Sequence, residues 1–411
     1  MATSVINTLS ILPSSFSVSW QDVVTASTLT AVAGKGYPIN TTSNACTITL
    51  PASASVGDQI IFIDYARTWG TNKITLDSNG LNYQGDSDAS TVEYTTDGTA
   101  LKIVYMDATQ GWVPTIDEAV SDAPSKGNSE GIFGYGEGPT AVTNLISNVG
   151  VVSTDVTGVG TARWDSAACE YGGDKGIFGY GYAPSSNRSM TNLVSNTGVV
   201  ATDTTGVGTD RNALGACGYG GDKGIFGYGT TGSIVSMTNL VSNAGVVATD
   251  VTGVGTARRE LAACEYGSDK GIFGFGTTGT TTGLTNLVSN VGVVATDVAA
   301  VGTGRRKIAA CGYGFDKGIF GYGTTAGAGL SVDETNLVSN VGVVSADVTG
   351  VGTARHGLSA TQYGGDKGIF GYGYHSGNKN MTNLVTNVGV VGTDVTGVGT
   401  ARAGLAACSF N

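Results

Sequence analysis

Residues 224–229 have the sequence Gly-Ile-Phe-Gly-Tyr-Gly, and residues 238–247 have the sequence Thr-Asn-Leu-Val-Ser-Asn-Ala-Gly-Val-Val. Asp250 and Arg258 follow them. This unit occurs six times in the 411-residue chain with small changes, and its copies start 45, 48, 47, 47 and 50 residues apart. The copies begin at Gly131, Gly176, Gly224, Gly271, Gly318 and Gly368. A period of about 40–50 residues with glycine and aromatic marks is typical of a β-propeller with one four-stranded blade per repeat.

We expect four strands in each repeat. The first is the Ala-Cys run, such as residues 261–267, and the second contains Lys-Gly-Ile-Phe-Gly-Tyr. The third contains Thr-Asn-Leu-Val-Ser, and the fourth begins at Gly-Val-Val. The repeats start at a second strand and end with a first strand at residues 405–411. The C-terminal strand should therefore pair beside residues 130–135 and close a six-bladed ring, because closure removes free sheet edges.

The first 116 residues have a different pattern. Apolar segments such as Gln-Ile-Ile-Phe-Ile at 59–63 are separated by Gly and Asn turns, which predicts a small all-β domain of seven or eight short strands. Its tryptophans Trp20, Trp69 and Trp112 are expected in the core. Residues 117–129 are polar and form the predicted linker. The expected organisation is an all-β domain at 1–116, a linker at 117–129 and the propeller at 130–411.

Composition argues against several classes of partner. Only 13% of residues are charged and the net charge is −11, which disfavours a nucleic-acid partner. No apolar run approaches the length of a transmembrane helix, so no membrane insertion is expected. Five of the six cysteines share one repeat position, where the remaining copy has Thr361. They are expected to be small buried side chains, and no metal or cofactor is predicted, because no ligand motif accompanies them.

An Asp and an Arg lie eight residues apart in every repeat. Because a six-fold catalytic apparatus is implausible, we interpret them as structural pins between the fourth strand and the next blade. The pairs are Asp155/Arg163, Asp203/Arg211, Asp250/Arg258, Asp297/Arg305, Asp347/Arg355 and Asp394/Arg402.

Strand direction predicts the functional face. The loops between the second and third strands and the links that follow each Arg should share one face, and both vary between repeats, whereas turns on the other face are nearly constant. Loops also drift without function, so this variation alone leaves both interpretations open. Aromatic and polar side chains on the variable face nevertheless suit a glycan or polar surface. The candidate receptor-binding residues are Trp164, Asp165, Tyr182, Asn187, Arg188, Arg259, Arg306, Lys307, His356, Tyr374, His375 and Lys379.

Two resemblances extend this interpretation. The order Arg, first strand, turn, apolar strand, Gly-x-Gly resembles a kelch blade, although the kelch double Gly and Trp are missing. The runs at 30–37 (Thr-Ala-Val-Ala-Gly-Lys-Gly-Tyr) and 109–112 (Thr-Gln-Gly-Trp), together with the repeats, resemble structural proteins of tailed bacteriophages, notably cyanophages. This resemblance implies a virion component made in the host cytoplasm. Other virion proteins are its expected partners, and a homotrimer is the expected assembly.

The favoured function is a non-enzymatic one: a tail fibre or receptor-binding adhesin that recognises a host cell-surface glycan or protein. A capsid- or tail-decorating protein is the first alternative. A glycan-cleaving fibre is the second, and it would need paired carboxylates in a cleft. Asp165, Glu260, Asp333 and Glu334 could supply such a pair, but no spacing selects them.

Overall fold

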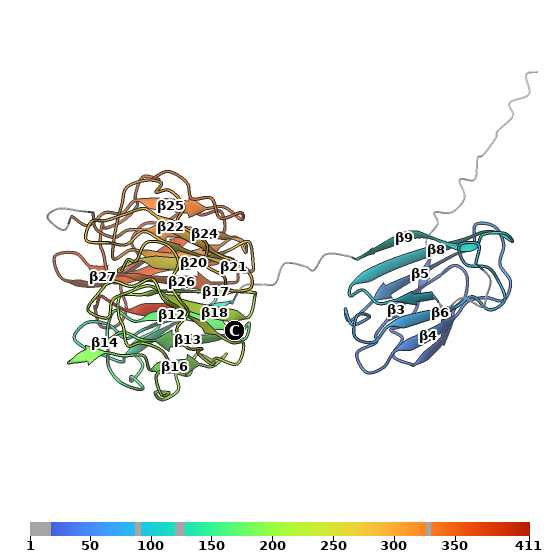
Figure 1. The fold of residues 1–411 in the computed structure, drawn as a ribbon, viewed down its shortest axis with the longest axis horizontal. Helices are drawn as coiled ribbons and strands as arrows, with labels where there is room; N and C mark the ends of the chain where they lie inside the picture. Colours follow the sequence, from blue (N-terminus) through green and yellow to red (C-terminus); the bar gives the residue numbers. More distant parts are fainter. Residues whose placement is uncertain (1–17, 87–91, 120–127, 326–329) are drawn as a thin grey trace, which may run out of the picture. The chain divides into compact units, whose positions relative to one another are not determined.

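The computed structural model describes residues 18–86, 92–119, 128–325 and 330–411. The chain divides into two compact units, Met1–Ala123 and Pro124–Asn411 (Figure 1). All 29 regular elements of the described residues are β-strands, which confirms the all-β class for that part of the chain. Residues 120–127, most of the predicted linker, lie outside the described residues. The described strand β9 (Gly111–Ala119) continues three residues into the segment predicted as linker.

The described residues of the N-terminal unit form nine strands in two sheets, one strand more than the upper limit of the prediction. One sheet has the order β1 (Ser19–Trp20), β3 (Lys35–Ile39), β5 (Gln59–Asp64), β8 (Thr99–Asp107) and β9. The other has the order β2 (Thr28–Thr30), β4 (Cys46–Thr49), β6 (Ile74–Asp77) and β7 (Val92–Tyr94). The first six strands alternate between the sheets and pair in parallel, so the chain coils from one sheet to the other.

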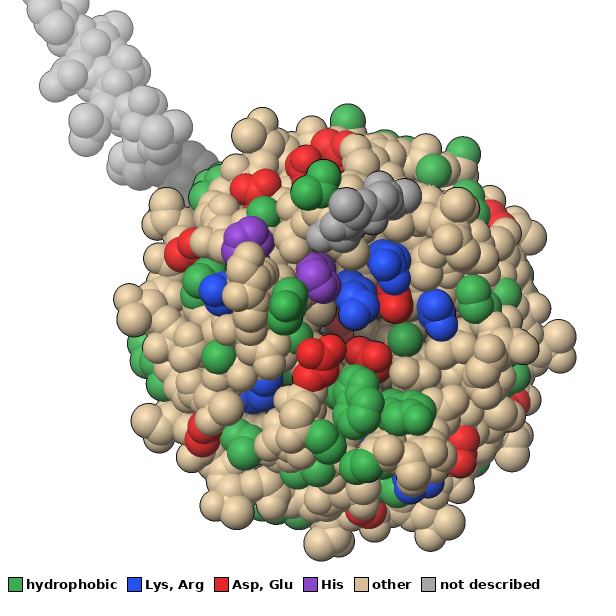
Figure 2. All heavy atoms as spheres, turned by 90° about the vertical axis from the view of Figure 1, so that its left-hand side faces the viewer, with side chains coloured by type: hydrophobic (Ala, Val, Ile, Leu, Met, Phe, Trp, Pro, Cys, Tyr) green, Lys and Arg blue, Asp and Glu red, His purple; other side chains and the backbone are tan. Residues whose placement is uncertain are grey.

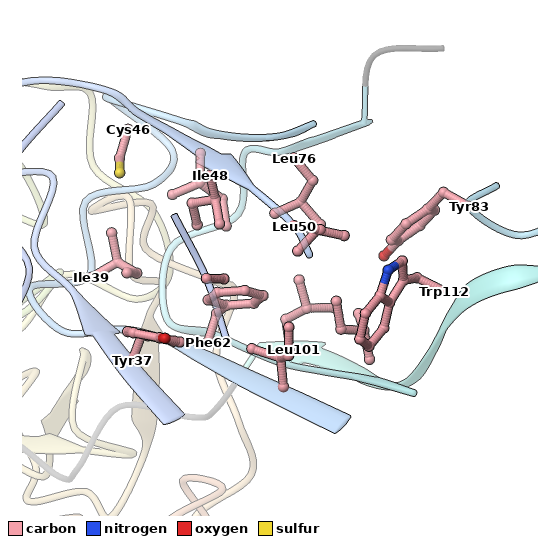
Figure 3. Packing of buried hydrophobic residues seen from close by; sticks show 14 of the residues in the cluster. Tyr37, Ile39, Cys46, Ile48, Leu50, Phe62, Leu76, Tyr83, Leu101 and Trp112 are labelled. Carbon is pink, nitrogen blue, oxygen red and sulfur yellow. The ribbon is translucent and has the colours of Figure 1, made fainter. Parts of the chain in front are cut away.

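The core of the N-terminal unit lies among apolar side chains from both sheets. Phe62 and Leu101 come from one sheet and Ile48 from the other, and all three are fully buried (Figure 3). Trp69 and Trp112 are also fully buried, as predicted. The prediction for Trp20 is wrong: it is 52% exposed, because it lies on the short edge strand β1, over Gly36.

The C-terminal unit contains six three-stranded antiparallel sheets, numbered 1 to 6 here in the order of their middle strands. The inner strands of sheets 1 to 6 are β29 (Ala406–Phe410), β12 (Ala167–Tyr171), β17 (Gly215–Tyr219), β20 (Ala262–Tyr266), β23 (Ala309–Tyr313) and β26 (Ser359–Tyr363). The middle strands are β10 (Glu130–Gly134), β13 (Lys175–Gly179), β18 (Lys223–Gly227), β21 (Lys270–Gly274), β24 (Lys317–Gly321) and β27 (Lys367–Tyr374). The outer strands are β11 (Thr143–Ile146), β16 (Thr191–Val194), β19 (Thr238–Val241), β22 (Thr285–Val288), β25 (Thr335–Val338) and β28 (Asn378–Val385). A small hairpin, β14 (Tyr182–Ala183) and β15 (Ser186–Asn187), extends the insert of sheet 2.

The predicted fourth strand does not form as a regular strand in any sheet of the described residues. In sheet 2 only two isolated bridges, Val194 with Val200 and Thr191 with Thr204, join the following segment to β16. The reason lies in Asn192, whose side-chain amide donates to the carbonyl of Ala201 (3.0 Å). A side chain thus takes an acceptor that a regular ladder would pair with a backbone N–H.

The glycines of the repeat allow neighbouring sheets to approach each other closely. A Cβ on Gly224 of sheet 3 would lie 2.5 Å from the sulfur of Cys169 in sheet 2. A Cβ on Gly227 would lie 2.7 Å from the ring of Phe273 in sheet 4. The cysteine position is buried in all six copies, including Thr361, so the prediction of small buried side chains there is confirmed. The Gly-Ile-Phe-Gly run therefore encodes contacts on both sides of each sheet.

The same contacts join the two ends of the C-terminal unit. The C-terminal strand β29 pairs antiparallel with β10, with Ile132 opposite Cys408. A Cβ on Gly371 of sheet 6 would lie 2.5 Å from the ring of Phe133 in sheet 1. Sheets 6 and 1 therefore contact each other as neighbouring sheets elsewhere do.

Candidate ligand-binding face

The predicted receptor-binding residues lie on one side of the C-terminal unit, called the variable face here. It is formed by the links between each conserved Arg and the next inner strand, and by the inserts between middle and outer strands. In each sheet the residue after the Arg pairs with an insert residue. These pairs are Ala403 with Glu137, Trp164 with Tyr182, Asn212 with Thr230, Arg259 with Thr277, Arg306 with Thr324 and His356 with Tyr374. Figure 2 shows acidic, basic and histidine side chains gathered around a hollow near the middle of this face.

A closed cycle of six backbone hydrogen bonds organises the centre of the variable face. Asp165 donates its N–H to Gly404, Ala213 to Asp165, and each equivalent residue to the one before it, at 2.8–2.9 Å. The six residues of this central ring are Asp165, Ala213, Glu260, Lys307, Gly357 and Gly404. Their φ angles lie between +49° and +63°. One backbone conformation is thus repeated six times and carries five different residue types.

The structure brings several predicted residues into direct contact. The rings of Trp164 and Tyr182 lie 5.0 Å apart, and those of His356 and Tyr374 lie 5.5 Å apart. An ion pair of 2.8 Å joins Arg306 of sheet 5 to the ring residue Glu260. Trp164, Arg306 and His356 each directly precede a residue of the central ring, so all three pairs lie beside it.

Asn187 and Arg188 hold the insert of sheet 2 in place, whereas the other predicted residues lie on the β27–β28 hairpin or, for Arg259, on a link. Asn187 donates its amide to the carbonyl of Thr230 (3.2 Å), and Arg188 donates to the hydroxyl of Ser186 (2.6 Å). Lys379 is on β28, where its carbonyl accepts the N–H of Arg402. His375 is exposed at the tip of the β27–β28 hairpin. Arg259 contributes a buried Nε without a hydrogen-bond partner.

The predicted structural pins connect different repeats, and the Asp and Arg of one repeat do not pair with each other. The fully buried Arg258 lies 3.6 Å from Asp297 of the next repeat, and its Nε donates to the carbonyl of Phe275 (2.9 Å). Its guanidinium also stacks 4.6 Å from the centre of the Tyr228 ring. Arg163, Arg211 and Arg355 make the same ion pair with the following Asp, and all six Arg side chains stack on the preceding aromatic ring.

The Asp residues of these pins are held in the ionised form. Asp155 accepts hydrogen bonds from Thr400 and from the amide of Asn144. Desolvation opposes ionisation, but the hydrogen bonds outweigh it and lower the pKa of Asp155 below 3.8. The equivalent Asp residues in the other five repeats have lowered pKa values for the same reason.

Two titratable groups at the central ring have shifted pKa values. Burial raises the pKa of Asp165 to about 6, with Lys307 opposing the shift and Glu260 and Glu137 adding to it. Burial also lowers the pKa of His356, and Lys307 and Arg306 lower it further. At neutral pH the imidazole is therefore uncharged, and Asp165 is close to its titration range.

Sequence reasoning missed two groups of residues. The first is Glu137 with the small residues Ala403, Gly404 and Gly357, which line a cavity beside the predicted aromatic residues. The sequence signal was available, because Ala403 occupies the position of Trp164 and His356. The prediction used large aromatic and polar side chains, and it therefore missed a cavity that small side chains leave open.

The second missed group is the glutamate pair Glu170 and Glu265 on the inner strands. They line a narrow space of about 50 Å³ that the inner strands surround. Burial raises the pKa of both glutamates. Equivalent positions hold Gly218, Gly312, Gln362 and Ser409. A Cβ on Gly218 would collide with Glu265, so the glycines between the larger side chains make room for them.

The four carboxylates considered for catalysis do not form a single cluster of contacts. Asp165 and Glu260 are both in the central ring, where Glu260 contributes to the raised pKa of Asp165. Asp333 and Glu334 lie on the insert of sheet 5, where the Glu334 carbonyl accepts a hydrogen bond from Arg305. Within the described ranges, no group of three or more His, Cys, Asp or Glu side chains is placed to hold a metal ion.

Comparison with models of known protein families found no match, and comparison with curated proteins found none either. Among the described residues, no helix has the length and apolar character needed to cross a membrane.

Proposed function

We propose that sheets 1 to 6 are the blades of a six-bladed, kelch-like β-propeller closed between β29 and β10. Equivalent contacts on both sides of each sheet support this architecture. Arg402 of the last repeat donates from Nε to the carbonyl of Tyr135 in the first repeat (2.8 Å), as Arg258 does to Phe275. A repeat with the same contacts on both sides favours a ring over an open row of sheets.

We infer that the chain is a structural protein of a bacteriophage virion, a tail fibre or receptor-binding adhesin, that recognises a host cell-surface glycan or protein. The observation that carries this proposal is the central ring, where one repeated backbone conformation presents different side chains in different blades. A repeated framework with varied side chains suits recognition, since loops on a rigid scaffold carry binding residues. The role proposed is binding and not catalysis.

The N-terminal unit has its own core and its own topology, which suits a separate role in assembly. We propose that it attaches the chain to other virion proteins and forms a homotrimer, leaving the variable face available to the host. Its expected location is the surface of the virion.

Labelled antibody against the chain, imaged on intact virions, tests this function directly. Label at the tail tip or along fibres is the expected result. Label spread over the capsid would support a decorating protein instead. Release of oligosaccharides from host polysaccharide by the purified chain would support a glycan-cleaving fibre.

A further inference from the structure

One cavity on the variable face differs from its surroundings in shape and chemistry. It has a volume of about 220 Å³. Its lining consists of Glu137, Asp165, Lys307, His356, Gly357, Tyr374, Ala403 and Gly404. Pockets for drug-sized ligands are larger, at about 300–1,000 Å³, so this cavity suits a single small ring.

The cavity exists because sheet 1 has small residues where other sheets have large ones. At the position after the conserved Arg, sheet 1 has Ala403, whereas the other sheets have Trp, Asn, Arg, Arg and His. At the next position sheets 1 and 6 have Gly404 and Gly357, whereas sheet 5 has Lys307. A Cβ on Gly404 would lie 3.1 Å from a carboxylate oxygen of Asp165 and 3.3 Å from Cγ of Glu137. Larger side chains would therefore fill the space.

Aromatic pairs border this gap on both neighbouring sheets. Sheet 6 carries His356 and Tyr374, and Tyr374 is 42% exposed. Sheet 2 carries Trp164 and Tyr182, and Cβ of Trp164 would lie 3.5 Å from a Cβ on Gly404. The exposed ring of Tyr374 offers an apolar face to a ligand together with a polar edge, whereas the other three rings are half-buried.

The charged side chains of the cavity lining restrict the charge that a ligand can carry. Glu137 and Asp165 supply carboxylate oxygens, which accept hydrogen bonds, and among the described lining residues Lys307 alone supplies an ammonium group. Two carboxylates beside one ammonium group disfavour a third negative charge, carried by the ligand, in so small a space. A ligand with several hydroxyl donors and no charge satisfies the acceptors without that repulsion.

We propose that this cavity binds one uncharged hexose unit of a surface glycan, with Tyr374 stacking on the sugar ring and Glu137 and Asp165 accepting from its hydroxyl groups. The biological source of the glycan rests on the proposed adhesin function, but the hexose site itself does not. The site lies at sheet 1, where the small residues Ala403 and Gly404 stand between the aromatic pairs of sheets 6 and 2, and residues of sheets 2, 5 and 6 complete its lining.

Saturation-transfer difference NMR on the full chain tests the proposal. The probes are methyl glycosides of glucose, galactose, mannose and N-acetylglucosamine, with methyl glucuronide as the anionic comparison. At least one neutral sugar should bind with a dissociation constant on the order of 1 mM, as expected for a ligand of about twelve non-hydrogen atoms. Binding of methyl glucuronide more tightly than any neutral sugar would overturn the charge argument.

Two variants locate the binding site. Ala403→Asn places in the cavity the residue that sheet 3 has at Asn212, and Tyr374→Ala removes the exposed ring. Each should weaken hexose binding about tenfold or more, a loss that direct titration resolves. The matched control, Asn212→Ala, alters the same repeat position in sheet 3, outside the cavity lining, and should bind as the parent chain does.

The outcomes separate this inference from the proposed function. Thermal melting identifies any variant that fails to fold, and a folded Tyr374→Ala chain that binds hexose normally would overturn the site. The absence of hexose binding by a parent chain that still adsorbs to cells would refute the sugar site alone. Hexose binding by a protein that antibody places away from the virion surface would refute the adhesin role alone.

Discussion

Replacement of Arg402 by Met tests whether the repeats close on themselves. Arg402 is 1% exposed and stacks 4.4 Å from the Tyr372 ring centre in its own repeat. It donates to the carbonyl of Tyr135 (2.8 Å) and the amide oxygen of Asn144 (2.7 Å) in the first repeat. Arg258→Met is the matched control in the middle of the array, where the guanidinium makes equivalent bonds to Phe275 and Asn286.

The expected loss in the free energy of unfolding follows from the hydrogen-bond acceptors that each variant leaves without donors. Each variant leaves a buried carbonyl and a buried amide oxygen without a partner, at about 1–3 kcal/mol for each group. The buried Met recovers part of this loss by apolar contact, and the stacking on the aromatic ring is lost. We expect each variant to lower the free energy of unfolding by about 3–5 kcal/mol. At about 2–4 °C per kcal/mol, the melting temperature should fall by about 6–20 °C.

Differential scanning calorimetry of the full chain measures both variants, with the transition of the C-terminal unit followed separately. In a closed ring the two losses should agree, because each arginine joins two neighbouring blades. An unchanged melting temperature for Arg402→Met, together with a lowered melting temperature for Arg258→Met, would refute closure, because Arg402 would then lie at a free end of the array.

Three further results are expected. Deletion of residues 404–411 should expose the edge of β10 and cause aggregation or loss of cooperative melting, and an unchanged melting curve would contradict this. Glu265→Gln should stabilise the chain at pH 7 but not below about pH 4 in denaturant titrations. Burial raises the pKa of Glu265 in the folded chain above the ordinary 4.5. As the pH rises from 4.5 towards that raised pKa, the ionisation of Glu265 therefore lowers the free energy of unfolding. By light scattering, residues 1–120 should form the oligomer and residues 129–411 should be monomeric, and the reverse pattern would move assembly to the C-terminal unit.

The repeat predicted the regular parts of the C-terminal unit because its local signals and its packing agree. Gly-Ile-Phe-Gly, preceded by Lys in five of the six sheets and by Glu130 in sheet 1, has the apolar content of a buried strand, and it lies in the middle strand of every sheet. The phase of the repeat also predicts which strands meet, since β29 lies opposite β10. In the N-terminal unit the parallel coiling of β1 to β6 was not predicted, because alternating short strands do not reveal their partners.

The sequence was less informative where side chains replace regular pairing. Gly-Val-Val looked like the start of a fourth strand, but Asn192 and its equivalents take carbonyls of that segment. The arginine pins were expected from their regular spacing, yet spacing along the chain did not reveal that Arg258 pairs with Asp297 of the next repeat. The repeat alignment shows that Ala403 and Gly404 are small, but the sequence does not show that they lie between the aromatic pairs of sheets 6 and 2, and the proposed hexose cavity was therefore missed.

The most direct test of the central claim is adsorption of the purified, fluorescently labelled full chain to host cells. We predict that a chain with Trp164, Arg188, Tyr374 and Lys379 all replaced by Ala melts as a folded protein but no longer adsorbs. A chain with Asp222 and Lys223 replaced by Ala, in the near-constant turns of the opposite face, should adsorb normally. Normal adsorption of the fourfold variant, together with loss of adsorption in the Asp222/Lys223 variant, would contradict recognition through the variable face.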